Sequence, residues 1–185
     1  MFLSTLGLRA KLLAGFAALA VVVLVVSIYA AMALSASNDR FISYTTGVGL
    51  KEEAAADLQG AASRRAIAVR DMALVEEPAA LRKYGEQAAK DHAAVVKALA
   101  ELKRLVEQDA VVMEDDRLVA EIDRIEARYG PVALSIVKQA AEGQREEAGR
   151  RIVKECQPLL DELVGTIDKF LAYEHEQTRV RTEAS

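Results

Sequence analysis

The chain has 185 residues, of which 28% are charged and 5% are aromatic, and its formal net charge is −4 at neutral pH. This mildly acidic balance gives no indication of nucleic-acid binding. Cys156 is the single cysteine, which excludes an intramolecular disulfide, so packing must supply the stability. We expect Cys156 to be a small core residue; a cross-chain disulfide or a reactive thiol is the alternative.

An uncharged segment from Leu12 to Leu34 follows the basic residues Arg9 and Lys11. As a helix this segment would be about 34 Å long, enough to cross a hydrocarbon core of about 30 Å. Because Lys and Arg favour the cytoplasmic flank, we expect residues 1–11 inside, a membrane span at 12–34 and export of residues 35–185. A cleaved signal peptide is the alternative, although its apolar core is usually shorter, about 7 to 15 residues. In a bacterium, either interpretation places residues 35–185 in the periplasm, and the uncleaved span anchors the chain in the inner membrane.

The exported part has a helical composition, rich in Ala, Leu, Val, Glu, Lys and Arg, with few Gly and Pro. Its apolar residues recur three and four positions apart in four successive segments, which predicts four long amphipathic helices. The four apolar stripes run from Leu58 to Met72, from Leu81 to Val106, from Leu118 to Ala140 and from Ile152 to Phe170.

Three short breaks separate the predicted helices. Pro78 suits the first turn of a helix, so the first helix ends just before it. The acidic run 114–116 opens the third helix at the positive end of its dipole, and Gly143 separates the third helix from the fourth. Short connections make sequential neighbours antiparallel. The predicted fold is therefore all-α, an N-terminal transmembrane helix followed by an antiparallel up-down-up-down four-helix bundle at 35–185.

Two prolines, Pro131 and Pro158, fall inside the helical pattern at similar distances from Gly143. Both helices should be kinked at that level. The kinks are either tolerated irregularities of a long bundle or a local opening that makes room for a ligand.

Catalytic and metal-binding patterns are absent from the sequence. Neither His92 nor His175 belongs to a Glu-x-x-His or His-Glu-x-x-His motif, and there is no Gly-rich phosphate loop. We therefore predict no enzyme activity, no catalytic residues, no metal and no cofactor. His92 lies on the apolar stripe of the second helix and is expected to pack there. The charged runs 51–53 and 174–176 are expected to be solvated.

Arginines of the first predicted helix differ from this background. Arg65 occupies a position of the apolar stripe, where a charge must be paired or hydrated. Arg70 lies on a second stripe together with Gly60, Ser63, Ile67 and Leu74. The first helix thus has two faces to bury, one in its own bundle and one against an identical chain. This pattern predicts a homodimer about a twofold axis.

Counted from the helix breaks, several arginines fall at similar heights in the half of the bundle farthest from the membrane. An arginine binds a carboxylate through two parallel hydrogen bonds, so a small organic acid or amino acid is the natural ligand. The alternative is that these arginines pair with Glu or Asp of their own helices, as Arg150 could with Glu146 or Glu147. The candidate ligand-binding residues are Arg64, Arg65, Arg70, Arg128, Tyr129 and Arg151.

The chain resembles the amino-terminal part of a bacterial methyl-accepting chemotaxis protein with a four-helix-bundle sensor domain. The resemblance is carried by residues 6–16, which lead into the predicted span, by residues 64–74 and by the helix layout. It implies a periplasmic dimer whose ligand binds at the subunit interface, held by arginines of the first helix with further contacts from the fourth. Arg70 matches the last arginine of the family's motif, and Arg65 or Arg64 matches an earlier one.

One arginine of the aspartate and serine receptors is missing, because Ala61 or Ala62 stands where it would lie. Citric-cycle acids or aromatic acids therefore fit as well as amino acids do. The resemblance further implies a second span after residue 185, and in the full-length protein a coupling protein and a histidine kinase as partners. Two alternatives stay open: the same bundle attached to a histidine kinase or a cyclic-dinucleotide enzyme, and a structural membrane-anchored bundle without a small ligand.

Overall fold

The structure, a computed structural model, describes residues 23, 49–108 and 113–183. The chain divides into two units, residues 1–45 and 46–185, and all the helices described below belong to the second. Apart from Val23, the predicted membrane span at 12–34 lies outside the described residues. Within the described ranges, no helix combines the length and the apolar character needed to cross a membrane.

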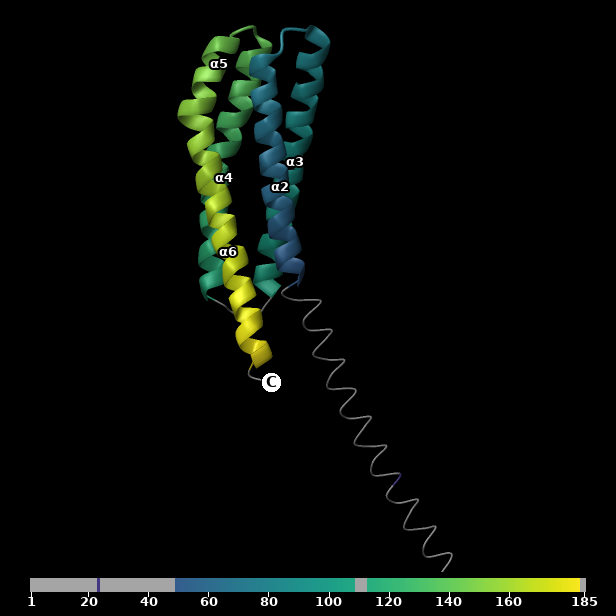
Figure 1. Cartoon of the computed structure of the whole chain (residues 1–185), viewed down its shortest axis with the longest axis vertical. Coiled ribbons are helices and arrows are strands. Elements are labelled where there is room, and N and C mark those ends of the chain that lie inside the picture. The colour runs from purple at the N-terminus through teal and green to yellow at the C-terminus, as the bar shows by residue number, and fades with distance from the viewer. Residues whose placement is uncertain (1–22, 24–48, 109–112, 184–185) are drawn as a thin grey trace, which may run out of the picture. The chain divides into compact units, whose positions relative to one another are not determined.

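Every described element of the second unit is helical (Figure 1), which confirms the all-α prediction. Three of the four long rods are uninterrupted α-helices, and the fourth is built from two α-helices joined by a π-helical turn. The elements are α2 (Gly49–Leu74), α3 (Pro78–Gln108), α4 (Met113–Ala141), α5 (Arg145–Arg151), the π-helix η2 (Ile152–Cys156) and α6 (Gln157–Glu183).

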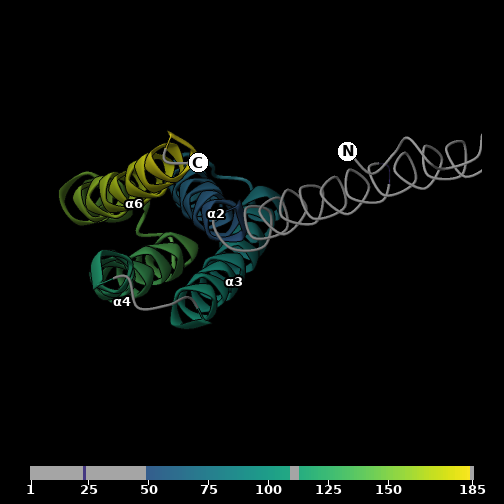
Figure 2. The same cartoon turned by 90° about the horizontal axis from the view of Figure 1, so that it is seen from below.

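The four rods form a bundle in which α2 contacts α3 and α6, and α4 contacts the same two helices from the other side (Figure 2). The short connections at 75–77 and 142–144 lie at the same end of the bundle, which we call the turn end (Figure 1). At the opposite end, called the open end, α2 and α4 begin and α6 finishes. These two ends position the charged groups discussed below.

The predicted apolar stripes form the core. Leu58 and Met72 of α2, Ile122 of α4 and Leu163 of α6 are all almost completely buried. Alanines occupy most of the other inward positions of α2. Because alanine is small, α2 also contacts α4 across the middle of the bundle.

The helix breaks follow the predicted turn chemistry. Gly143 has a φ of 87°, a left-handed conformation that glycine adopts without steric cost. The N–H groups of Gly143 and Gln144 donate to the carbonyls of Ala140 and Gln139, the pattern of a glycine-terminated helix end. Pro78 is the first residue of α3, where its missing N–H costs nothing.

The two prolines are accommodated differently. Pro131 lies inside α4, which continues as one helix from Met113 to Ala141. Pro158 is the second residue of α6, just beyond the π-helical turn, where the N–H of Gln157 donates to the carbonyl of Ile152, five residues back. A proline cannot donate a backbone hydrogen bond, and a wide turn is a common way to relieve this defect. The fourth rod is therefore irregular where the sequence predicts an irregularity, whereas α4 is not interrupted.

Candidate ligand-facing arginines and buried ion pairs

Arg65 of α2 lies at the centre of a buried polar cluster in the bundle core. Its side chain is fully buried, and Nη1 and Nη2 each donate to one carboxylate oxygen of Glu126 at 2.7 Å. Nη1 also lies 2.8 Å from Nδ1 of His92, and Cζ lies 4.3 Å from the centre of the Tyr129 ring. We call these four residues the Arg65 cluster. Of the two expected arrangements for a charge at this stripe position, paired or hydrated, the structure shows the paired one.

The electrostatics of the Arg65 cluster favour its charged form. Burial alone would lower the pKa of Arg65, but the hydrogen bonds and the charge of Glu126 outweigh it, so the pKa lies above its ordinary value. Because the guanidinium has no acceptor, the hydrogen bond to His92 requires an unprotonated Nδ1. Burial raises the pKa of the Tyr129 hydroxyl, and this buried hydroxyl forms no hydrogen bond with the described residues.

Gly130 and Cys156 pack next to the Arg65 cluster. A Cβ on Gly130 would lie 2.8 Å from Oε1 of Glu126, so only glycine leaves room for the carboxylate at this point of α4. Cys156 is buried beside Tyr129, and burial raises the pKa of its thiol. The prediction that Cys156 is a core residue is confirmed.

Arg64 precedes Arg65 but faces outward. Its Nε lies 3.3 Å from Oδ1 of Asp91, and 57% of its side chain is exposed. Asp91 is buried and also accepts a hydrogen bond from Gln87 at 2.7 Å. Two consecutive arginines of α2 therefore contact two consecutive residues of α3. The Arg64–Asp91 pair lies towards the surface, and the Arg65–His92 pair lies in the core.

Arg70 lies on the outer face of α2, on the side of α6. Its guanidinium is exposed, and the contact between Nη2 and Oε1 of Gln157 is long, at 3.4 Å. The predicted second stripe lies on this outer face: Ile67 is 54% and Leu74 is 73% exposed. Arg64 and Arg70 thus stand on opposite sides of an exposed apolar stripe.

The remaining candidate arginines have acidic partners. Arg128 lies 3.3 Å from both oxygens of Glu162, and both groups are exposed. Arg151 donates twice to Glu155 at 2.9 Å and also contacts Ser135 and Gln139. Of the six candidates, the structure brings Arg65 and Tyr129 into direct contact.

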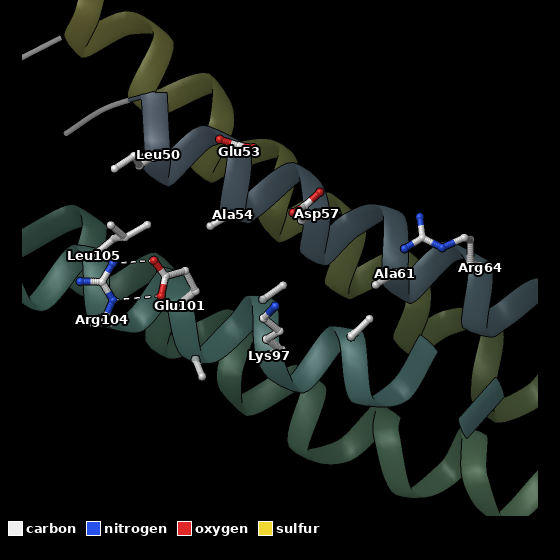
Figure 3. Close-up of a pocket in the computed structure, with 13 residues that line it drawn as sticks. Leu50, Glu53, Ala54, Asp57, Ala61, Arg64, Lys97, Glu101, Arg104 and Leu105 are labelled. Carbon is white, nitrogen blue, oxygen red and sulfur yellow. Dashed lines mark hydrogen bonds and ion pairs between the residues drawn. The ribbon is translucent and has the colours of Figure 1, made fainter. Parts of the chain in front are cut away.

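A shallow groove that the sequence did not indicate runs between α2 and α3 (Figure 3). Its volume is about 770 Å³, and a smaller hollow of about 230 Å³ near the turn end shares Arg64 with it. Alanines form much of its floor, with Glu53 and Asp57 on the α2 wall and Lys97 and Arg104 on the α3 wall.

Sequence reasoning missed a second buried group of charges, at the open end. Lys51 Nζ lies 2.7 Å from Oδ2 of Asp115 and 3.4 Å from Oε1 of Glu174, and each side chain is only 3% exposed. We call these three residues the Lys51 cluster. The expectation that the runs 51–53 and 174–176 are solvated is therefore wrong for Lys51 and Glu174.

The missed signal is periodicity. Lys51 stands seven residues before Leu58, one heptad earlier on the buried stripe of α2. Glu174 stands four residues after Phe170 on the buried stripe of α6. Charged residues that continue an apolar stripe turn inward with it, and extending the stripes by one turn would have found them.

Residues 5–184 match the family model described as a four helix bundle sensory module for signal transduction. The chain belongs to this family of sensory modules of chemotaxis receptors. The expected resemblance is thereby confirmed. Comparisons with curated proteins and with solved structures found no match. The family is one of signalling modules rather than of enzymes.

Proposed function

We propose that this sensory module is the periplasmic receptor part of a bacterial inner-membrane chemoreceptor and that it binds a small organic acid or amino acid. In this proposal residues 12–34 anchor the module in the lipid bilayer. Two copies pair through the outer face of α2, and the signal passes to the chemotaxis pathway through a coupling protein and a histidine kinase. Membership of the sensory-module family supports the signalling role.

The main observation behind the ligand site is the contrast among the arginines of α2. Arg65 is already bound on two sides by Glu126 at 2.7 Å. Arg64 and Arg70 are exposed, and their contacts with the described residues are long, at 3.3 and 3.4 Å. The Arg70 contact with Gln157 is exposed, and the Arg64 contact with the buried Asp91 is stretched, so a ligand carboxylate can compete for both guanidinium groups. We therefore assign the first contacts with the carboxylate to Arg64 and Arg70.

A twofold dimer would complete this site. Gly60, Ser63 and Ile67 lie between the two arginines on the outer face of α2, and their small or apolar side chains suit close helix pairing. Because the two arginines flank this stripe, a partner helix packed on it brings Arg64 of one copy towards the partner's Arg70. Arg65 and Tyr129 then support α2 from the inside, while Arg128 and Arg151 keep their acidic partners.

Thermal unfolding of the detergent-solubilised 185-residue chain tests this assignment. A panel of dicarboxylates, aromatic acids and amino acids is added, and carboxylates are expected to dominate the stabilising compounds. A ligand at 100 times its dissociation constant stabilises by about 2.7 kcal/mol. Arg70→Ala and Arg64→Ala should each abolish the shift. Arg117→Ala is the matched control, because Arg117 is equally exposed but lies near the start of α4.

Unchanged binding in both α2 variants would exclude the arginine site. Equilibrium ultracentrifugation with and without the stabilising compound tests the dimer, and a strict monomer in both conditions would exclude a site between two copies. If no compound of the panel binds, a structural bundle without a small ligand is favoured instead.

A further inference from the structure

The Lys51 cluster connects three helices at the open end of the bundle. Lys51 lies in the first turn of α2, Asp115 in the first turn of α4, and Glu174 in the second half of α6. Asp115 and Glu174 both contact the ammonium group of Lys51, and all three side chains are 97% buried. Among the described residues, no other group of charged side chains joins α2, α4 and α6 at this end of the bundle.

The charges of this cluster do not balance. Among the described residues, two carboxylates share one ammonium group, so full ionisation of both would leave one net negative charge in a buried place. An unbalanced charge in the interior is costly, and proton uptake removes it. Oδ1 of Asp115 is buried, and no donor among the described residues reaches it. A proton carried by the neighbouring carboxyl of Glu174 can supply that donor.

We propose that the Asp115–Glu174 carboxyl pair takes up one proton when the pH falls, and that this proton strengthens the attachment of α6 to α2 and α4. The module would then respond to pH at its open end, separately from any ligand bound near Arg64 and Arg70.

The titration behaviour of the pair supports the proposal. Burial is the largest cause that raises the pKa of Glu174, from 4.5 to about 7, and the negative charge of Asp115 acts in the same direction. The positive charge of Lys51 opposes both. Because the two carboxyl groups interact closely, the proton belongs to the pair rather than to one residue.

The sign of the effect follows from linkage. The folded chain holds the proton up to a pH of about 7, whereas the unfolded chain releases it near 4.5. The stabilisation is therefore complete below the unfolded value and is lost as the pH rises through about 7. A wild-type chain should unfold at a lower temperature at pH 8 than at pH 5.5.

Another ionisable contact between α6 and α2 lies beside the cluster and must be separated from it. His175 lies 3.3 Å from Glu52 of α2, and its side chain is 71% exposed. Protonation of His175 would also strengthen a contact between α6 and α2, but on the surface. A His175→Gln variant is therefore the control.

The experiment records thermal unfolding of the detergent-solubilised full chain between pH 5.5 and 8. Gln is a neutral copy of the protonated side chain, so Glu174→Gln should unfold at a higher temperature than the wild type, by a margin that grows from pH 5.5 to several degrees at pH 8. His175→Gln should keep the wild-type pH dependence. A Glu174→Gln variant that is as pH-dependent as the wild type, or loss of the dependence in His175→Gln, would overturn the proposal.

A measurement on the wild-type chain keeps the test independent of variant folding. Carbon-13 NMR of a chain labelled at the glutamate carboxyl carbons should show one signal with a midpoint near 7. If every glutamate signal titrates below pH 6, the proposal fails. Neither measurement uses a carboxylate ligand, so the result is independent of the arginine site.

Discussion

The two buried charge clusters of this bundle differ in balance and in geometry. In the Arg65 cluster one guanidinium meets one carboxylate through two hydrogen bonds of 2.7 Å. In the Lys51 cluster one ammonium group is shared by two carboxylates at 2.7 and 3.4 Å. The planar guanidinium fixes its partner and remains charged, whereas the ammonium is a point charge that leaves a carboxylate in excess. A balanced pair therefore gives a fixed connection between helices, and an unbalanced group gives one that depends on pH.

The largest expected effect comes from breaking the balance of the Arg65 cluster. Glu126→Gln leaves a buried guanidinium without its counter-charge, which should lower the free energy of unfolding by about 3 to 5 kcal/mol. Urea denaturation at constant pH measures the change. Glu162→Gln removes the exposed partner of Arg128 and should cost only about 0 to 1 kcal/mol. Equal losses in the two variants would show that burial does not distinguish these pairs.

A smaller effect is expected at the glycine that gives the carboxylate its space. Alanine usually favours a helix over glycine by about 1 kcal/mol, but at position 130 its Cβ would displace Oε1 of Glu126. Gly130→Ala should therefore destabilise by about 1 to 3 kcal/mol. Gly165→Ala is the control, because a Cβ there meets no atom within 4 Å, and it should stabilise the chain. Stabilisation by both variants would refute the packing argument.

The smallest effect is expected at Cys156. The reactivity of its thiol reports whether the core around the Arg65 cluster opens to solvent. A buried thiol whose pKa is raised is mostly protonated and inaccessible. Cys156 of the folded chain should react with a thiol reagent far more slowly than Cys156 of the urea-unfolded chain. Once unfolded, every chain should react to the same extent. Equal rates in both states would mean that the core opens at this level.

Helix positions were predictable because they depend on local information. The apolar period, the proline at position 78 and the glycine at position 143 are properties of neighbouring residues, and α3 and the turn after α4 follow them closely. The interior position of Arg65 was also predictable, since the apolar stripe of the first helix includes it. Its partner Glu126 was not predictable, because many acidic residues lie at comparable heights on the other three helices.

The charged residues at the ends of the apolar stripes show most clearly what could not be predicted from the sequence. Lys51, Asp115 and Glu174 each look like members of exposed charged runs when read with their immediate neighbours. The groove between α2 and α3 was likewise not predicted, because its shape depends on how closely two alanine-rich faces approach each other.

The sequence by itself determined an all-α chain, the breaks between its helices, most of the inward faces of those helices and the family to which the chain belongs. Only the tertiary structure decided which charges share the interior. Glu126 is 61 residues from Arg65, and Glu174 is 123 residues from Lys51. Such partners meet through the rotation and the relative height of packed helices, which depend on the fit of the whole core rather than on any one segment.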